Sequence, residues 1–409
     1  MMDIIPLFQN KHIVLGIAGG IAVYKVADLA SKLTQAGAQV DCVLTESATK
    51  FVAPLTFAAV TGRAALTDAD LWRHDLHVPH VALGESADLI IIAPATANTL
   101  AKLAHGQADN LLTVTTLAAR CPVVVVPAMD GGMWSNAATQ ANVATLRERG
   151  VRLLGPATGR MASGLTGEGR MVEPPDILGF IRVVLAEGGS LAGRKIVVTT
   201  GGTYEAIDPV RFIGNRSSGK QGFAIAQAAI DRGARVTLIA GATTLATPFG
   251  AERIDVESAQ TMRAKVIEAC RDADALIMAA AVADFQSAHT ADQKIKKTKD
   301  TVEFEIKLIR TPDILEAVKE QRDRTEKPKV VIGFAAETQH LIDNARAKLT
   351  SKGPDLIAAN DVSAADAGFA VDTNRVTLLD AGGGVEPLPI MSKVQVAEHV
   401  LDRMTALLG

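Results

Sequence analysis

The chain carries the same strand–loop–helix unit twice, and this repeat limits the folds that it can adopt. The first copy has an apolar strand over 12–16, the loop Ala18-Gly19-Gly20 and a helix over about 22–36. The second has a strand over 196–199, a Gly-rich loop that ends near residue 222, and an Ala-rich helix over 223–232. A further strand follows each helix, so the pattern predicts parallel strands that are connected by helices.

Both halves of the chain continue this alternation. Short apolar strands are expected over 89–93, 123–126, 275–280, 330–334 and 355–359. The composition, with 48% hydrophobic but only 4% aromatic residues, is typical of sheets that helices cover on both faces. The glycines within 187–193 suit a short connector. We therefore predict two α/β domains over 1–190 and 191–409, each a doubly wound parallel sheet of the Rossmann-like kind.

Several classes of protein are disfavoured by composition. A formal net charge of −3 gives no reason to expect attraction to nucleic acid or to membrane surfaces. Cys42, Cys121 and Cys270 are far apart, which argues against a disulfide framework or a zinc ribbon, and we predict no metal site built by the protein alone. No signal peptide or membrane-spanning stretch is evident. We expect a cytoplasmic protein that acts on small molecules.

The loop after the first strand is a candidate phosphate cradle. Gly16 and Gly19 lie where the strand turns into the helix, and backbone amides at such a turn can surround an anion. The dinucleotide pattern GxGxxG does not fit, because residue 21 is isoleucine, and the next strand does not end in an acidic residue. Thr45 and Ser47 follow that strand instead. These neutral donors favour a mononucleotide phosphate over a ribose diol, which argues against an NAD-linked dehydrogenase.

Three motifs of the first half follow strands or begin helices, so they are expected at one edge of the sheet. They are His80, the run PATANT over 94–99, and PAMDGGMW over 127–134. In this series the chain resembles the flavin-dependent cysteine decarboxylases, whose fingerprint is a catalytic His, then PASANT, then PxMNxxMW. The first domain is therefore expected to have the fold of that family.

This resemblance implies a decarboxylation that oxidation assists. FMN would oxidise the CH2–SH group of 4′-phosphopantothenoylcysteine, CO2 would leave, and the reduced flavin would return a hydride to give 4′-phosphopantetheine. His80 would be the catalytic base or an orienting residue, since imidazole exchanges protons near neutral pH. The implied FMN contacts are Gly16, Gly19, Thr45, Ser47, Ala95, Thr96 and Asn98, and the implied substrate contacts are Asp130, Met133 and Arg170.

Two residues depart from the family pattern. Asp130 stands where the family often has Asn, and an ionised carboxylate would repel a substrate carboxylate that an amide could bind. Ser163 stands in the Gly-rich flap where the family often has a Cys that donates a proton. A hydroxyl is a far weaker acid than a thiol, whose pKa is about 8.5. We hypothesise that Ser163 keeps this catalytic place with an altered proton route.

The second half contains a different set of motifs. They are IDPVRFIGN over 207–215, the lysine run that begins at Lys294, PDIL over 312–315 and GFAAET over 333–338. In these it resembles the phosphopantothenate–cysteine ligases. That family activates the carboxylate of 4′-phosphopantothenate with CTP and Mg2+, and cysteine then displaces CMP from the acyl-cytidylate. Ser217, Ser218 and Gly219 begin the following helix and could hold a phosphate.

The resemblance also assigns roles to single residues of the second half. Asn215 and Lys294 are implied as catalytic, Asn215 by orienting the acyl intermediate and Lys294 by neutralising the triphosphate. Arg211 and Asn215 would contact the substrate. The implied CTP contacts are Met278, Ala279, Ala280, Asp284, Lys294, Pro312, Asp313, Ile314, Leu315, Phe334, Lys348 and Lys352.

Together the two halves resemble the bifunctional enzymes of coenzyme A biosynthesis, and this resemblance covers nearly the whole chain. It implies a homo-oligomer, a dodecamer built from flavin-domain trimers and ligase-domain dimers. One alternative stays open at this point. The substitutions at Asp130 and Ser163 would also fit a ligase whose flavin-binding half has lost decarboxylase activity and serves as a regulatory or scaffold unit.

Overall fold

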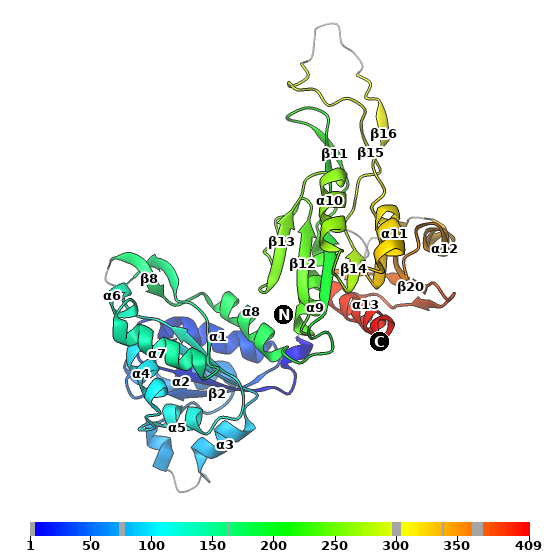
Figure 1. Cartoon of the computed structure of the whole chain (residues 1–409). Coiled ribbons are helices and arrows are strands. Elements are labelled where there is room, and N and C mark those ends of the chain that lie inside the picture. Colours follow the sequence, from blue (N-terminus) through cyan, green and yellow to red (C-terminus); the bar gives the residue numbers. More distant parts are fainter. Residues whose placement is uncertain (1–4, 73–77, 162–163, 297–303, 338, 362–370) are drawn as a thin grey trace. The chain divides into compact units, whose positions relative to one another are not determined.

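The computed structural model describes residues 5–72, 78–161, 164–296, 304–337, 339–361 and 371–409 (Figure 1). The chain divides into two compact units, Met1–Leu185 and Ala186–Gly409. Each is described separately below. None of the helices within the described ranges combines the length and the apolar character that a membrane span needs.

Unit 1 is built on one six-stranded sheet in which all neighbouring strands are parallel. The order β3-β2-β1-β4-β5-β6 is that of a doubly wound Rossmann-like sheet, so the predicted fold class is confirmed for this unit. Its strands are β1 (His12–Ile17), β2 (Gln39–Leu44), β3 (Leu66–Thr67), β4 (Leu89–Ala95), β5 (Val123–Pro127) and β6 (Arg152–Leu153). The short hairpin of β7 (Ala157–Arg160) and β8 (Thr166–Arg170) is separate from this sheet.

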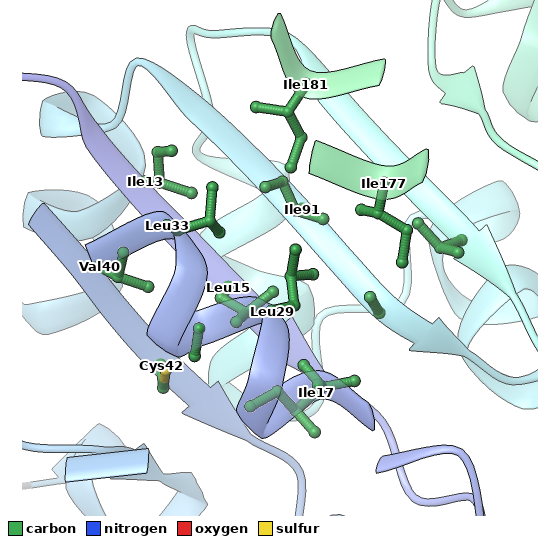
Figure 2. Close-up of a cluster of buried hydrophobic side chains, with 14 of the residues drawn as sticks. Ile13, Leu15, Ile17, Leu29, Leu33, Val40, Cys42, Ile91, Ile177 and Ile181 are labelled. Atoms are coloured by element: carbon green, nitrogen blue, oxygen red, sulfur yellow. The ribbon is translucent and has the colours of Figure 1, made fainter. Parts of the chain in front are cut away.

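Two buried clusters cover the faces of this sheet, because successive side chains of a strand point to opposite sides. Ile13, Leu15 and Ile17 of β1 pack with Leu29 of α1 and Ile177 of α8, as Figure 2 shows. Val14 of the same strand belongs to the opposite cluster. The helices of unit 1 are α1 (Val23–Gln35), α2 (Pro54–Thr61), α3 (Pro79–Ser86), α4 (Ala97–His105), α5 (Leu111–Leu117), α6 (Gly131–Trp134), α7 (Ala137–Glu148) and α8 (Pro174–Leu185).

Unit 2 has an eight-stranded sheet of order β13-β12-β9-β14-β17-β18-β20-β21. Its first six strands are parallel, as predicted, whereas the last two are antiparallel. The antiparallel strands at this edge of the sheet were not expected. The turn over 381–384 joins β20 to β21, and a turn this short can join only antiparallel neighbours. The strands are β9 (Lys195–Thr200), β12 (Arg235–Ala240), β13 (Ala251–Asp255), β14 (Ala275–Met278), β17 (Val330–Glu337), β18 (Leu356–Asp361), β20 (Val376–Asp380) and β21 (Val385–Pro387).

Two antiparallel strand pairs of unit 2 form an arm that extends away from the sheet (Figure 1). They are β10 (Tyr204–Ala206) with β11 (Phe212–Gly214), and β15 (Phe285–Ser287) with β16 (Leu308–Arg310). A third small pair is β19 (Thr373–Asn374) with β22 (Met391–Ser392). The helices of this unit are α9 (Lys220–Asp231), α10 (Ala259–Ala269), α11 (Ile314–Thr325), α12 (Leu341–Lys352) and α13 (Lys393–Leu408).

Candidate active sites

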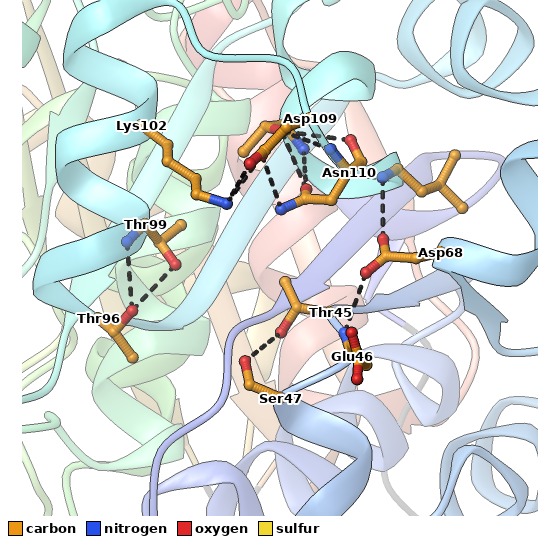
Figure 3. Close-up of polar contacts among 11 residues, drawn as sticks. Thr45, Glu46, Ser47, Asp68, Thr96, Thr99, Lys102, Asp109 and Asn110 are labelled. Atoms are coloured by element: carbon orange, nitrogen blue, oxygen red, sulfur yellow. Dashed lines mark hydrogen bonds and ion pairs between the residues drawn. The ribbon is translucent and has the colours of Figure 1, made fainter.

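Hydroxyl groups gather at the carboxyl edge of the sheet in unit 1, where parallel strands end together (Figure 3). Thr45 and Ser47 follow β2, and their hydroxyl oxygens lie 3.1 Å apart. Thr96 follows β4 and caps α4, where its hydroxyl oxygen accepts a hydrogen bond from the amide of Thr99. Asn98 is exposed on the first turn of that helix. Ala95 is fully buried, and its carbonyl oxygen accepts from the amide of Ala128.

The loop after β1 approaches this edge closely. A Cβ atom on Gly19 would lie 2.4 Å from the hydroxyl oxygen of Ser47, so only glycine fits where the two loops meet. A Cβ on Gly20 would be in ordinary contact with Thr96, at 3.7 Å. Gly16 is explained by packing, because a Cβ there would lie 2.3 Å from a methyl carbon of Leu112. This combination of a tight glycine turn with neutral donors fits the phosphate of a flavin mononucleotide.

His80 lies in the first turn of α3 and is half-buried. Its Nδ1 atom is buried and has no hydrogen-bond partner among the described residues. Because a buried nitrogen without a partner is costly, this atom is suited to meet a polar group of a ligand. Ser163, the other catalytic residue predicted for this half, lies outside the described residues.

The three predicted substrate contacts of unit 1 lie on adjoining segments. Asp130 is the N-cap residue of α6, and its Oδ1 accepts a hydrogen bond from the amide of Gly132 at 3.0 Å. One oxygen of this carboxylate is therefore engaged by the helix and is not wholly available to a substrate. Met133, in α6, is half-exposed. The amide of Met129 donates to the carbonyl of Gly169 at 2.9 Å, which ties the segment before α6 to the β7–β8 hairpin. Arg170 ends that hairpin.

Arg170 is committed to an ion pair. Its Nη2 lies 2.7 Å from Glu173 Oε1, which also accepts from Lys25 at 2.7 Å. The hydrogen bond from Lys25 and, less strongly, the one from Arg170 lower the pKa of the Glu173 carboxyl. A substrate anion that meets Arg170 must therefore share its guanidinium with Glu173.

Unit 2 contains a cavity of about 910 Å³ at the carboxyl edge of its sheet. The chain brings three helix N-termini to it, those of α9, α11 and α13, and their amides favour bound anions. The predicted nucleotide and substrate residues that line the cavity are Asn215, Met278, Ala279, Ala280, Asp284, Pro312, Asp313, Ile314, Leu315, Phe334, Lys348 and Lys352.

Small residues let the backbone approach this cavity. Gly219 has φ +78°, a conformation that glycine adopts without strain, just before α9. A Cβ on Gly222 would lie 2.4 Å from the hydroxyl oxygen of Thr200, so α9 packs directly on β9. The amide of Ala280 donates to the hydroxyl of Thr199 at 3.2 Å, which fixes the turn after β14. These contacts hold the predicted phosphate loop beside the turn that follows β14.

One end of the cavity carries lysines from α12. Lys352 Nζ lies 2.7 Å from Asp313 Oδ2, at the start of α11. Burial alone would raise the pKa of Asp313, but hydrogen bonds from Lys352 and from the amide of Glu316 outweigh it and lower that pKa. Asp313 therefore stays ionised and caps α11 while it holds Lys352 in place.

Lys294 and Arg211 do not line this cavity within the chain. Both lie at the arm, where Asp208 organises them. Arg211 Nη1 donates to Asp208 Oδ2 at 2.8 Å and to the carbonyl of Ile295 at 3.1 Å. The amide of Ile295 also donates to Asp208 at 3.1 Å. The segment that carries Lys294 is thus fixed to the β10–β11 hairpin, and the expected meeting of Lys294 with the other CTP residues is not seen in a single chain.

Several lining residues had escaped prediction from the sequence. Asn360 follows the buried strand segment 356–359, so the rule that sites form at the carboxyl ends of parallel strands could have found it. Gln221, Asn374 and Lys393 also line the cavity. No motif marks them, because Asn374 and Lys393 reach the site from the unexpected antiparallel part of the fold.

Comparison with known protein families divides the chain into the same two halves. The family described as Flavoprotein matches residues 7–186, and the DNA/pantothenate metabolism flavoprotein C-terminal domain matches residues 191–408. The coenzyme A biosynthesis bifunctional protein CoaBC of Bacillus subtilis is 45% identical over 404 residues, with 98% of each chain covered. Its Mycobacterium tuberculosis counterpart is 46% identical over 410 residues, covering 98% of this chain and 97% of its own.

Among solved structures, the C-terminal domain of a CoaBC protein is 38% identical, with a TM-score of 0.45, and it covers 54% of this chain and 98% of its own. The full-length matches give both halves of the chain a counterpart, and they argue against the NAD-linked dehydrogenase interpretation. The chain is a flavoprotein that belongs to the CoaBC family of bifunctional coenzyme A biosynthesis proteins.

Proposed function

We propose that this chain carries out two consecutive reactions of coenzyme A biosynthesis. Unit 2 ligates 4′-phosphopantothenate to cysteine with CTP, and unit 1 decarboxylates the product, 4′-phosphopantothenoylcysteine, with FMN. The observation that carries the proposal is the cavity in unit 2, which gathers the nucleotide residues that the ligase motifs imply, with the exception of Lys294. Family membership over the full length favours two activities over a ligase with a silent flavin-binding half.

The ligase reaction needs an activated carboxylate. In the proposed sequence, an oxygen of the substrate carboxylate attacks the α-phosphorus of CTP, and pyrophosphate leaves with the electrons of the broken P–O bond. The amine of cysteine then attacks the acyl carbon, and CMP leaves. Helix N-termini, Lys348 and Lys352 would stabilise the phosphate charge, and Mg2+ would arrive with the nucleotide beside Asp284.

In this proposal Asn215 orients the acyl group. Its Nδ2 donates to the carbonyl of Val282 at 3.0 Å, on the turn after β14, which fixes the amide plane at the wall of the cavity. The second hydrogen on Nδ2 is then available to the carbonyl oxygen under attack. Asn215 therefore acts as a donor toward the oxyanion.

In unit 1 the tight loop at Gly19, with Thr45, Ser47, Thr96 and Asn98, would hold the flavin phosphate and its polar edge. FMN supplies a reversible two-electron oxidation when it is bound. The chain's own contribution is to hold the substrate and to move protons. His80 would do so through Nδ1, and Ser163 would keep the place of the final donor.

The proposal includes self-association. Large apolar side chains are exposed near the Gly19 loop, where Ile21 is 63% and Tyr24 is 64% exposed. On the arm of unit 2, Val210 and Phe212 are 60% and 52% exposed. Exposed apolar side chains of this size would suit the expected trimer and dimer contacts. A ligase dimer would also give Lys294, which lies outside its own cavity, a route to the nucleotide of a neighbouring chain.

A reconstitution separates the two activities. The purified protein is mixed with CTP, Mg2+, cysteine and 4′-phosphopantothenate, and pyrophosphate and CO2 are followed together. We expect both products, a flavin absorption spectrum, and CO2 that depends on CTP unless 4′-phosphopantothenoylcysteine is supplied directly. Formation of pyrophosphate without CO2 under either condition would support the ligase activity and contradict the decarboxylase activity.

A further inference from the structure

Thr311 lies where the arm of unit 2 meets the cavity. It directly follows β16, and Asp284 directly precedes β15, the antiparallel partner of β16. Phe285 pairs with Arg310 in this ladder, so Asp284 and Thr311 are the next opposing positions. Both residues line the cavity. These two positions therefore join the base of the arm to the edge of the cavity.

Thr311 binds both peptide groups that flank Asp284. Its hydroxyl donates to the carbonyl oxygen of Ala283 at 2.6 Å, and its amide donates to the carbonyl oxygen of Asp284 at 3.0 Å. The first carbonyl belongs to the peptide group before Asp284, and the second belongs to the peptide group after it. A backbone carbonyl can only accept a hydrogen bond, so the hydroxyl hydrogen of Thr311 is committed to Ala283. One residue thus restrains the backbone on both sides of Asp284.

The peptide group between Val282 and Ala283 is fixed as well. Its carbonyl oxygen accepts from Asn215 Nδ2 at 3.0 Å, and its N–H donates to Thr203 Oγ1 at 2.9 Å. Thr203 is fully buried and Ala283 is 3% exposed. Three consecutive peptide groups are therefore held by hydrogen bonds from other segments. Because this turn is buried, the loss of one partner leaves a polar backbone atom unpaired, which is costly unless the turn moves.

The carboxylate of Asp284, in contrast, is available to a ligand. The residue is exposed, and its side chain has no hydrogen bond or ion pair with the other described residues. The backbone alone therefore sets its position. Mg2+ prefers carboxylate and phosphate oxygens, so an unpaired carboxylate in a cavity with three helix N-termini fits a metal ion that arrives with a triphosphate.

We infer that Thr311 is a positioning residue for Asp284. By holding the two flanking peptide groups, Thr311 keeps the carboxylate where it meets the complex of CTP and Mg2+. The inference rests on the proposed ligase function. A carboxylate that is ordered before the ligand arrives loses less conformational entropy on binding. The hydroxyl hydrogen of Thr311 is already committed, so this residue acts through Asp284 and not by donating to the nucleotide.

The test uses the full-length protein and calorimetry with CTP and Mg2+. Thr311→Val removes the hydroxyl and keeps the shape of the side chain, whereas Thr311→Ser keeps the hydroxyl. Asp284→Ala removes the carboxylate, and a variant with Thr311→Val and Asp284→Ala together completes a double-mutant cycle. Thr325→Val is the matched control. Thr325 ends α11 and also donates to a backbone carbonyl, that of Gln321 at 2.9 Å, but it does not line the cavity.

Thr311→Val should weaken CTP binding by about threefold to tenfold, the effect of one lost neutral hydrogen bond. Asp284→Ala should weaken it at least as much, whereas Thr311→Ser and Thr325→Val should bind CTP as the wild type does. In the Asp284→Ala background, Thr311→Val should cause no further loss, because no carboxylate is left to position. The KM for cysteine, measured from pyrophosphate release at saturating CTP, should be unchanged in Thr311→Val.

Different results overturn different claims. A wild type that does not bind CTP overturns the proposed ligase function. If the wild type binds CTP, wild-type affinity in either Thr311→Val or Asp284→Ala overturns the inference about Thr311. The same loss from Thr311→Val with and without the Asp284 carboxylate also overturns it, as does a Thr311→Ser variant that binds as weakly as Thr311→Val. A cysteine KM that rises by the same factor would show a general loosening of the cavity and would count against it. Thr311→Ala supplies the comparison if Thr311→Val does not fold.

Discussion

Lys352 Nζ and Asp313 Oδ2 lie 2.7 Å apart across one wall of the cavity in unit 2. The pair connects the end of α12 with the start of α11, and both residues belong to motifs that imply contact with CTP. The carboxylate holds the lysine in place, so the ammonium group is already positioned when a triphosphate arrives. This arrangement reduces the side-chain ordering that binding would otherwise require.

Lys352→Met should weaken CTP binding by about tenfold or more, because a hydrogen bond to a charged group is worth about 1.5–3 kcal/mol. Asp313→Asn should have a smaller effect, since it loosens Lys352 without removing its charge. Lys319→Met is the control, because Lys319 lies on α11 but does not line the cavity. Calorimetry with CTP and Mg2+ measures all three. Equal affinities for Lys352→Met and Lys319→Met would show that Lys352 does not contact the nucleotide.

Gly19→Ala should abolish FMN binding, whereas Gly20→Ala should retain it. The new methyl group of Gly19→Ala would lie 2.4 Å from the hydroxyl oxygen of Ser47 and would push apart the two loops that form the phosphate cradle. At Gly20 the same methyl group has ordinary contact at 3.7 Å. The flavin absorption of the purified variants, after incubation with excess FMN, gives the answer. Full flavin occupancy in Gly19→Ala would remove this loop from the proposed site.

Much of the fold follows from local pattern. The longer buried strands of both sheets could be predicted because they give short aliphatic runs between helices, and β1 and β9 each precede a glycine turn. The strands β3, β6 and β13 were not predicted. β20 and β21 could not be predicted, since a sheet-edge strand after six parallel ones carries no distinct periodicity. Their antiparallel pairing follows from the short turn over 381–384.

The candidate sites show the same division. Phe334 and Lys348 could be predicted because motifs mark them, and both line the cavity. Asp130 was ambiguous in sequence, and its capping bond to Gly132 becomes visible only with the backbone of α6 in place. The contacts among Gln221, Asn374 and Asn360 depend on side chains from three distant segments. No spacing along the chain indicates that Gln221, Asn374 and Asn360 meet.

Asp41→Asn should destabilise unit 1 and change the pH dependence of its stability. Asp41 accepts from His12 Nε2 at 2.5 Å and from Arg63 Nε at 2.6 Å. Burial would raise the pKa of Asp41, but these two hydrogen bonds outweigh it and lower that pKa to about 2. The hydrogen bond to Asp41 raises the pKa of His12 despite burial. Removing one partner of such a buried pair costs about 3–5 kcal/mol.

The signs of the two shifts define the pH windows. The lowered pKa of Asp41 contributes stability that is present above about 4 and is lost as the pH falls toward 2. The raised pKa of His12 contributes stability that is full below 6.5 and declines as the pH rises through its folded value. Urea unfolding from pH 5 to pH 9 should therefore show a decline above pH 6.5 in the wild type and a flatter profile in Asp41→Asn. Parallel profiles would exclude this pair as the cause.

Ser163→Cys should speed the last step of the decarboxylase. The final protonation needs an acid, and a thiol with a pKa of about 8.5 donates a proton far more readily than a serine hydroxyl. Wild type and Ser163→Cys are compared in single turnovers that start from 4′-phosphopantothenoylcysteine. We expect CO2 release at similar rates in both, because this residue acts after the carboxylate has left. The release of 4′-phosphopantetheine should be faster in Ser163→Cys, with less of the unsaturated thiol product accumulating.

Ser163→Ala distinguishes the two possible proton routes in the wild type. An unchanged rate of 4′-phosphopantetheine release would mean that water or another group delivers the proton. A further loss of rate would show that the hydroxyl relays it.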